Sequence, residues 1–132
     1  IPYLPVDIVA AEDCTVMFLN GKTLLNTCDN SCTFHHTLIR NLLGIVAQKN
    51  MYLNQKIKYT SRKTAREKLM AYLTDQAKLK RSNDFTIPFN RQELADYLGV
   101  ERSAMSAELG KLTKLGILRT QRSHFTLLKP LD

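Results

Sequence analysis

The chain has 132 residues, of which 44% are hydrophobic and 23% charged, and its formal net charge at pH 7 is +7. This composition is sufficient for one compact core or for two small units that share a helix, and it excludes a chain that is disordered throughout. No apolar run approaches 18 residues, so we expect no membrane span. The three cysteines, without a signal peptide, favour a reduced cytoplasmic protein. Because the sequence begins at Ile1 and not at Met, we expect a fragment or a processed chain.

The positive charge is concentrated in the second half of the sequence. Residues 1–54 carry a balance of −1, whereas residues 55–132 carry a balance of +8. Such an asymmetry suits a polyanionic partner, because each neutralised phosphate releases counterions. A basic surface that only keeps the protein soluble is the alternative interpretation, because charge asymmetry alone is a weak signal.

The first segment is predicted to be short strands followed by a helical turn. Residues 7–11 and 15–19 are rich in apolar and β-branched side chains and flank a polar break at residues 12–13. Asn20 and Gly21 form a turn, and residues 22–27 are expected to make a short helical turn. Two short strands are not stable alone, so we expect the end of a larger β-domain whose beginning is missing.

A long amphipathic helix is predicted next, from the capping residues at 29–31 to about Lys58. Its apolar residues recur at spacings of three and four, as one face of a helix requires. The face is too wide to be covered by two strands, so we expect it to pair with a second copy of the chain. Packing within a fuller monomer is the alternative. The predicted dimer-interface residues are Leu38, Leu42, Val46, Leu53 and Ile57.

Residues 59–61 interrupt this pattern and are predicted to be a hinge between two domains, 1–58 and 59–132. They also provide capping groups for the next helix, whose predicted buried face consists of Ala65, Leu69, Tyr72 and Leu73. That helix is predicted to end at the polar loop of residues 80–84. Residues 85–89 are then expected to form a short strand, with Pro88 in an edge position.

The remaining segment has the pattern of a winged helix-turn-helix. Asn90 and Glu93 have the spacing of a capping box, and Gly99 stands where a tight turn needs a positive φ angle. A second helix is predicted from Arg102 to about Leu115, with Gly116 as its C-cap. Residues 117–120 and 124–128 are expected to form a hairpin, the wing, around residues 121–123. The opposite face of the second helix has small and polar residues, which allow close approach to base edges in the major groove of DNA.

Several of these segments resemble Crp/Fnr-type transcription regulators. Residues 91–106 (RQELADYLGVERSAMS) resemble the DNA-binding segment of that family, and residues 64–69 (TAREKL) resemble the first helix of its DNA-binding domain. Residues 14–19 (CTVMFL) resemble the closing strands of its cyclic-nucleotide-binding-like β-roll. Residues 34–39 (FHHTLI) resemble the start of its dimerisation helix. The resemblance therefore implies an α+β fold with a β-roll remnant, a long dimerisation helix and a C-terminal winged helix-turn-helix.

The resemblance implies a bacterial, cytoplasmic homodimer that binds a palindromic operator in double-stranded DNA under effector control, with RNA polymerase as a further partner. Carried over by position, Arg102, Ser103 and Ser106 would contact bases, and Arg91 and Gln92 would contact phosphates. Arg122 and His124 in the wing are further phosphate candidates. In the family the effector is a cyclic nucleotide, an iron–sulfur cluster, haem or another small molecule, and the sequence does not indicate which of these applies. An effector site, if the protein has one, is expected to lie mostly upstream of Ile1, so the cofactor is unknown.

Two positions depart from the family pattern. Many members have an arginine that reads guanine where this chain has Ala107, whose methyl group can instead contact a thymine methyl. The operator sequences of other family members are therefore not expected to be the operator of this protein. Glu101 stands where a capping Ser or Thr is common, and its charge suits a helix N-terminus but repels a nearby phosphate.

Two other classes of function are alternatives to DNA binding. The first alternative is a metal or redox sensor that uses Cys28, Cys32 and His35. The spacing of these residues is not that of a standard zinc site, so the sequence favours simple packing of these side chains. A winged helix that docks onto another protein is the second alternative. No Gly-rich phosphate loop or catalytic arrangement stands out, so an enzyme is not expected.

Overall fold

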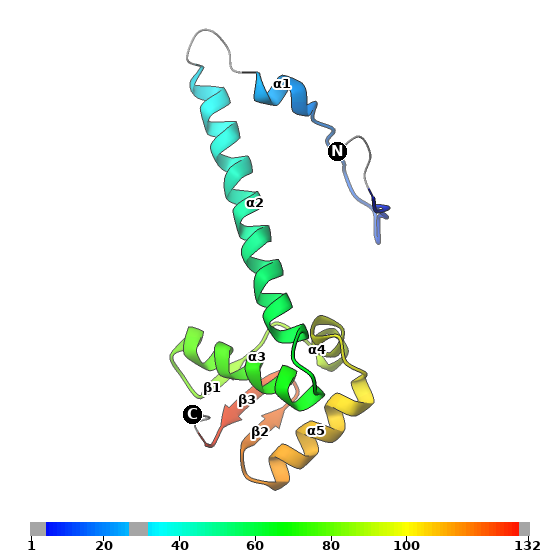
Figure 1. Ribbon diagram of the computed structural model, residues 1–132, viewed down its shortest axis with the longest axis vertical. Coiled ribbons are helices and arrows are strands. Elements are labelled where there is room, and N and C mark those ends of the chain that lie inside the picture. Colours follow the sequence, from blue (N-terminus) through cyan, green and yellow to red (C-terminus); the bar gives the residue numbers. More distant parts are fainter. Residues whose placement is uncertain (1–4, 27–31, 130–132) are drawn as a thin grey trace. The chain divides into compact units, whose positions relative to one another are not determined.

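A computed structural model describes residues 5–26 and 32–129 (Figure 1). The described residues fall into two compact units, residues 1–46 and 47–132, and each is treated by itself. The boundary between them lies inside helix α2, which spans Thr33–Thr60. The domain boundary predicted at residues 58–59 stays a prediction.

The described residues of the first unit contain one short helix besides the first part of α2. Helix α1 spans Gly21–Leu25, and the side chain of Asn20 caps it by accepting hydrogen bonds from the backbone N–H groups of Lys22 and Thr23. The helical turn predicted at residues 22–27 is therefore present, but it begins one residue earlier and ends at Leu25. The capping residues predicted at 29–31 lie outside the described residues.

The strands predicted at residues 7–11 and 15–19 are wrong. Residues 5–20 contain no strand or helix, and side chains such as Ile8 and Phe18 are exposed. The physical reason is that a strand needs a neighbour: two short strands without further pairing partners or a covering layer do not bury enough apolar surface. The assignment of this segment to a β-roll rests on the sequence resemblance alone.

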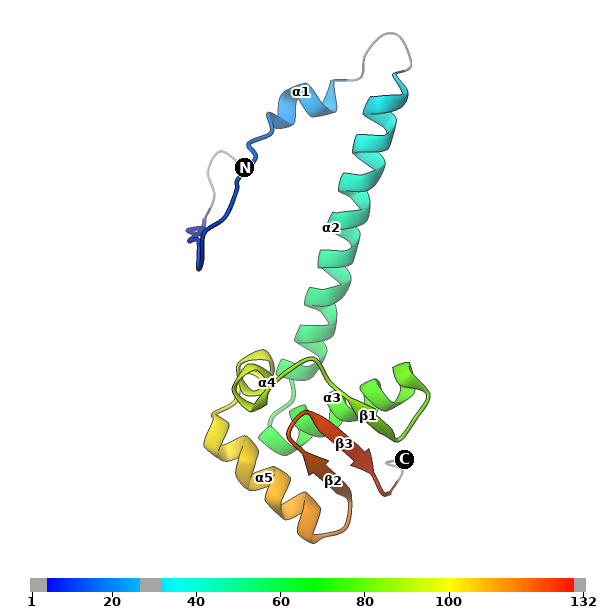
Figure 2. The ribbon, with the colours of Figure 1, turned by 180° about the vertical axis from the view of Figure 1, so that it is seen from behind.

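The second unit is a winged helix-turn-helix, as predicted, and belongs to the α+β class. Its elements after α2 are α3 (Ala65–Lys80), β1 (Asp84–Thr86), α4 (Arg91–Leu98), α5 (Arg102–Lys114), β2 (Leu118–Gln121) and β3 (His124–Leu127). The strands form an antiparallel sheet in the order β1-β3-β2. Figure 2 shows the hairpin of β2 and β3 beside α3 and α5.

The core of this unit lies between the helices and the inner face of the sheet. Alternation along the strands turns Leu118, Phe125 and Leu127 inward, and spacings of three and four turn one face of each helix toward them. Burial of these side chains supplies the main stabilising term of the domain. The fully buried large side chains are Leu69, Leu73, Leu94, Leu98, Met105, Leu112, Leu118 and Phe125.

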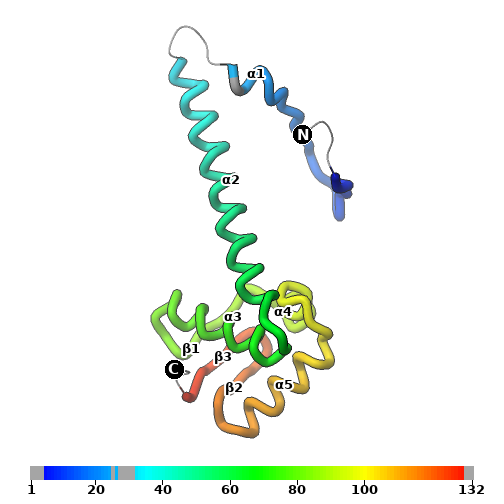
Figure 3. Tube along the Cα trace, viewed as in Figure 1, coloured from blue at the N-terminus to red at the C-terminus, as the bar shows by residue number. Residues whose placement is uncertain are grey.

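The last turns of α2 are packed onto this domain (Figure 3). Tyr59 is 3% exposed. Its ring packs edge-on against the ring of Tyr72, with 5.5 Å between the ring centroids, and its hydroxyl donates a hydrogen bond to the Asp75 carboxylate at 3.1 Å. Burial raises the pKa of Tyr72 to about 12. The first residue of the hinge predicted at residues 59–61 is therefore part of the core, because the ring of Tyr59 packs among the other core side chains.

Helix α3 begins later than the predicted caps at residues 59–61. Thr64 is its N-cap, and its hydroxyl accepts from the backbone N–H of Glu67 at 3.1 Å while the Glu67 carboxylate accepts from the backbone N–H of Thr64. The Glu67 carboxylate also accepts from the backbone N–H of Lys63, and these backbone hydrogen bonds lower its pKa. This reciprocal capping box fixes the chain that joins α2 to α3.

Candidate nucleic-acid interface

The start and the end of α4 are formed by the residues that the sequence singled out. Asn90 accepts from the backbone N–H of Glu93 at 2.9 Å, and the Glu93 carboxylate accepts from the backbone N–H of Asn90 at 2.7 Å, so the capping box is confirmed. Gly99 ends α4 at a φ of 61°, as its predicted place in a tight turn requires. Val100 then donates its backbone N–H to the carbonyl of Ala95, which directs the chain into α5.

Helix α5 has one buried and one exposed face. Met105, Leu109 and Leu112 are buried in the core, whereas Arg102, Ser103, Ser106 and Ala107 are exposed. The N-cap of α5 is Glu101, whose side chain makes no capping hydrogen bond. The predicted base-contacting residues thus lie together on the accessible face of the second helix of the motif.

The wing is held against the segment that precedes α4. Arg122 and Ser123 connect β2 to β3, where Gln121 pairs with His124. The Ser123 hydroxyl donates to the carbonyl of Phe89 at 2.8 Å, and the Ser123 carbonyl accepts from the backbone N–H of Ile87 at 2.9 Å. These two bonds fix the tip of the wing near the start of α4.

A hollow of about 480 Å³ opens between the start of α4, the start of α5 and the wing tip. It brings together four of the predicted DNA-binding residues, which carry three guanidinium groups and one amide. None of the described residues that line it is acidic. Its lining residues are Asn90, Arg91, Gln92, Arg102, Arg122 and Ser123.

Asn90 and Ser123 were not predicted as site residues. Asn90 was predicted as a helix cap and Ser123 as part of the wing loop, so the signal that could have found them was their place beside predicted site residues. Ser103, Ser106 and His124 do not line the hollow. Ser103 and Ser106 lie further along the exposed face of α5.

Arg91 lies half-buried at the hollow and is held in place by the domain. Its guanidinium donates to the hydroxyl of Thr120 and stacks on the ring of Phe125, with 4.9 Å between the guanidinium carbon and the ring centroid. Burial lowers the pKa of Arg91, but a guanidinium stays charged at neutral pH. The hollow therefore has a fixed positive charge in its wall.

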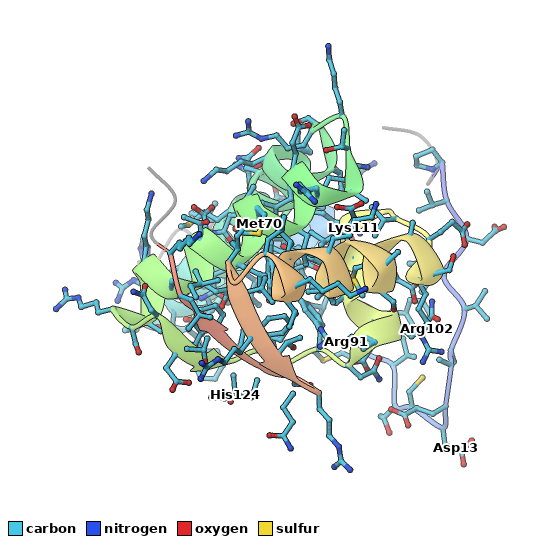
Figure 4. The ribbon with its side chains drawn as sticks, turned by 90° about the horizontal axis from the view of Figure 1, so that it is seen from below. Asp13, Met70, Arg91, Arg102, Lys111 and His124 are labelled. Carbon is cyan, nitrogen blue, oxygen red and sulfur yellow. The ribbon has the colours of Figure 1, made fainter. Side chains whose placement is uncertain are left out.

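The guanidinium groups of Arg102 and Arg122 are available to a ligand. No hydrogen bond or ion pair joins either side chain to another residue in the part of the chain that the structure describes. Figure 4 shows Arg102 at the N-terminal end of α5, with Arg91 on the same side of that helix. Gln92 is partly engaged, because its amide donates to the Asp96 carboxylate at 2.9 Å.

His124 has partners on the neighbouring strand and lies apart from Arg91 and Arg102 in Figure 4. Its Nε2 pairs with the Asp84 carboxylate at 2.5 Å, and its Nδ1 lies 3.0 Å from the hydroxyl of Thr86. A phosphate would have to compete with Asp84 for this side chain. Of the two wing candidates, Arg122 is therefore better placed for a DNA contact.

The side of α5 that faces α3 has its charges paired within the protein. The Glu108 carboxylate accepts from Lys111 Nζ at 2.8 Å and from Arg66 Nε at 2.9 Å. Figure 4 shows Lys111 on this side, away from Arg91 and Arg102. The available guanidinium groups of Arg102 and Arg122 consequently lie at the hollow and not on the side of α5 that faces α3.

The candidate metal residues are only partly described. Cys28 lies outside residues 5–26 and 32–129, and both Cys32 and His35 have interactions within the protein. Among the described residues, no group of three or more His, Cys, Asp or Glu side chains is arranged to hold a metal ion. No described helix is long and apolar enough to cross a membrane.

The sequence of residues 67–131 matches the family model of the Crp-like helix-turn-helix domain. Residues 67–131 are a Crp-like helix-turn-helix domain. The resemblance to Crp/Fnr-type regulators is thereby confirmed for the part of the chain where its motifs are most specific. A Crp-like helix-turn-helix domain is a DNA-binding domain of transcription regulators.

Comparisons with individual known proteins give the following result. A crystal structure from Eubacterium rectale, assigned to the Crp/Fnr family of transcriptional regulators, is 16% identical to this chain with a TM-score of 0.47. The match covers 75% of this chain and 44% of that protein, so the chain spans less than half of its length. A comparison with curated proteins finds no match.

Proposed function

We propose that the protein is a homodimeric, sequence-specific transcription regulator that binds a palindromic operator in double-stranded DNA. The observation that carries the proposal is the hollow in the Crp-like domain, where Arg91, Arg102 and Arg122 meet without an acidic neighbour among its described lining residues. Arginine is the residue type that most often binds phosphates and guanine edges in two-pronged contacts.

In the proposed complex, α5 enters the major groove and its exposed face approaches the bases. Arg102 reads a base edge, and Ser103 and Ser106 contact bases or the backbone at close range. Arg91 and Gln92 contact phosphates, which position the helix without adding sequence information. Arg122 is a further contact from the wing, and His124 contributes less because Asp84 holds it.

The exposed face of α2 supports the homodimer. Leu38, Leu42 and Val46 are 36%, 41% and 58% exposed, and Leu53 and Ile57 are 53% and 60% exposed. Monomeric proteins rarely leave this many large apolar side chains of one helix in water, so a second copy of the helix is the proposed cover. Two domains related by a two-fold axis would read an operator with the same symmetry.

The finer parts of the proposal rest on the sequence resemblance alone. They are a bacterial source, a cytoplasmic location, contact with RNA polymerase, and control by an effector. Because Tyr59 is in the core of the DNA-binding unit, an effector-driven movement would carry the last turns of α2 together with that unit. Equal operator affinity of the intact protein with every candidate effector would contradict this control.

The first test is selection of bound sequences from a random duplex library, followed by titrations of wild type and Arg102→Ala. We expect wild type to select a palindrome, and Arg102→Ala to lose preference at one base pair of each half-site, a discrimination of about 1–3 kcal/mol. Arg119→Ala is the control, because it removes the same charge from an exposed residue outside the hollow.

Arg119→Ala is expected to keep the base preference of wild type. Equal binding of wild type to all duplexes would leave electrostatic attraction alone and contradict the proposal. Binding to a protein partner with weak salt dependence would then favour the docking-module alternative.

A further inference from the structure

The hollow separates two available arginine side chains that belong to different elements. Arg102 begins the second helix of the motif, and Arg122 occupies the tip of the wing. Between them lie Asn90, Gln92 and the anchored guanidinium of Arg91. Polar amides and a fixed positive charge are the groups that bind a sugar-phosphate backbone in protein–DNA complexes.

This arrangement determines which groove each arginine faces, if the proposed function is correct. With α5 in the major groove, the object that fits between the helix and the wing is the sugar-phosphate strand that borders this groove. The other side of that strand is the adjacent minor groove. Arg102 therefore lies on the major-groove side, and Arg122 lies on the minor-groove side.

The tip of the wing holds Arg122 in a defined place. Arg122 and Ser123 form the two-residue loop between β2 and β3, and the φ angle of 53° at Arg122 is the positive value that such a hairpin loop requires. Ser123, the next residue, is bonded to Phe89 and Ile87. The loop that carries Arg122 is therefore fixed beside the hollow, while its guanidinium stays available.

We infer that Arg122 enters the minor groove that flanks each half-site and makes the protein prefer A·T-rich flanks. A narrow minor groove, typical of A-tracts, has an enhanced negative potential that attracts arginine. The exocyclic amino group of guanine also projects into this groove and obstructs a side chain there. This inference rests on the proposed function and adds a second specificity determinant to it.

The experiment uses the whole chain and duplexes that share the selected palindrome and differ in their flanks. Three flanks are compared: A·T pairs, G·C pairs, and inosine·C pairs. Inosine·C keeps the major-groove edge of G·C but lacks the guanine amino group in the minor groove. We expect wild type to bind the A·T and inosine·C flanks several-fold more tightly than the G·C flank.

Three variants separate minor-groove reading from a simple phosphate contact. Arg122→Ala is expected to bind all three flanks equally, to keep the half-site preference, and to lower the salt slope by about one. Arg122→Lys retains the charge but is more strongly hydrated, so we expect a normal salt slope without flank preference. Arg119→Ala, the matched control, is expected to keep the flank preference.

Each outcome decides between the two proposals. Flank preference that persists in Arg122→Ala, or equal affinity of wild type for the three flanks, overturns the minor-groove assignment while the operator proposal stands. A preference for A·T that inosine·C does not restore assigns the reading to the major groove and also overturns it. Absence of any selected palindrome contradicts the proposed function itself. Thermal unfolding of each variant verifies that it is folded.

Discussion

Arg91 differs from the other two arginines of the hollow in how its charge is held. Its guanidinium is bonded to Thr120 and stacked on Phe125, so a phosphate would meet a group that has already lost much of its side-chain freedom. A preorganised group loses less conformational entropy on binding than a free one. In the proposed complex, Arg91 would therefore combine a contact with DNA and its contacts within the domain.

Two substitutions separate these contributions. Arg91→Ala removes the charge, so we expect weaker DNA binding and a salt slope smaller by about one. Thr120→Val keeps the charge and removes the hydrogen-bond acceptor, so we expect weaker binding with an unchanged salt slope. Titrations at several salt concentrations measure both quantities. A smaller salt slope in Thr120→Val would contradict the positioning role of Thr120.

At the scale of elements, α3 and α5 are joined by a charge cluster on the side away from the hollow. Hydrogen bonds from Lys111 and Arg66 lower the pKa of Glu108 below its ordinary value of 4.5. A carboxyl group whose pKa is lowered in the folded state stabilises the fold above its unfolded pKa. This contribution is lost as the pH falls through the folded pKa.

Glu108→Gln is therefore expected to be less stable than wild type at neutral pH and to approach wild type at a pH of about 3. Urea unfolding at the two pH values measures the difference. Glu12→Gln is a suitable control, because Glu12 is exposed and lies outside the helices, so its charge contacts no helix terminus. A Glu108→Gln difference that is the same at both pH values would show that its carboxylate charge is not involved.

The local signals of the second unit were sufficient to predict its elements. The capping box of Asn90 and Glu93 and the positive φ of Gly99 depend on residues a few positions apart, and both predictions are confirmed. The wing was predicted in the same way, from two apolar strands around a short polar loop. In the first unit, the strand predictions failed because alternation indicates a strand only where a pairing partner exists.

Parts of the candidate site could not be predicted, because they depend on contacts between distant positions. Arg91 bonds Thr120, 29 residues away, and His124 pairs with Asp84 across the sheet. Neither contact leaves a periodic signal in the sequence. The sequence therefore identified which residues carry suitable chemistry, whereas the fold decides which of these are available to a ligand.

At the scale of the whole molecule, the two-fold symmetry of the proposed operator depends on the apolar face of α2. A leucine that becomes buried in an interface contributes about 1.5–3 kcal/mol, and symmetry doubles each contribution. Leu42 is 41% exposed in the single chain, which leaves much of its surface to be covered by a second copy. A charged residue at position 42 would be buried in the interface in both chains of the dimer, and the two like charges would lie near each other.

Leu42→Glu is accordingly expected to convert the protein from a dimer to a monomer, as measured by sedimentation equilibrium. Its affinity for the palindrome should fall to that for an isolated half-site, while half-site binding itself should not change. Leu79→Glu is the matched control, because Leu79 is equally apolar and 76% exposed but lies on α3. A monomeric wild type that binds the palindrome no better than a half-site would contradict the dimer. If Leu42→Glu and Leu79→Glu weakened association equally, the interface would not be the predicted face of α2.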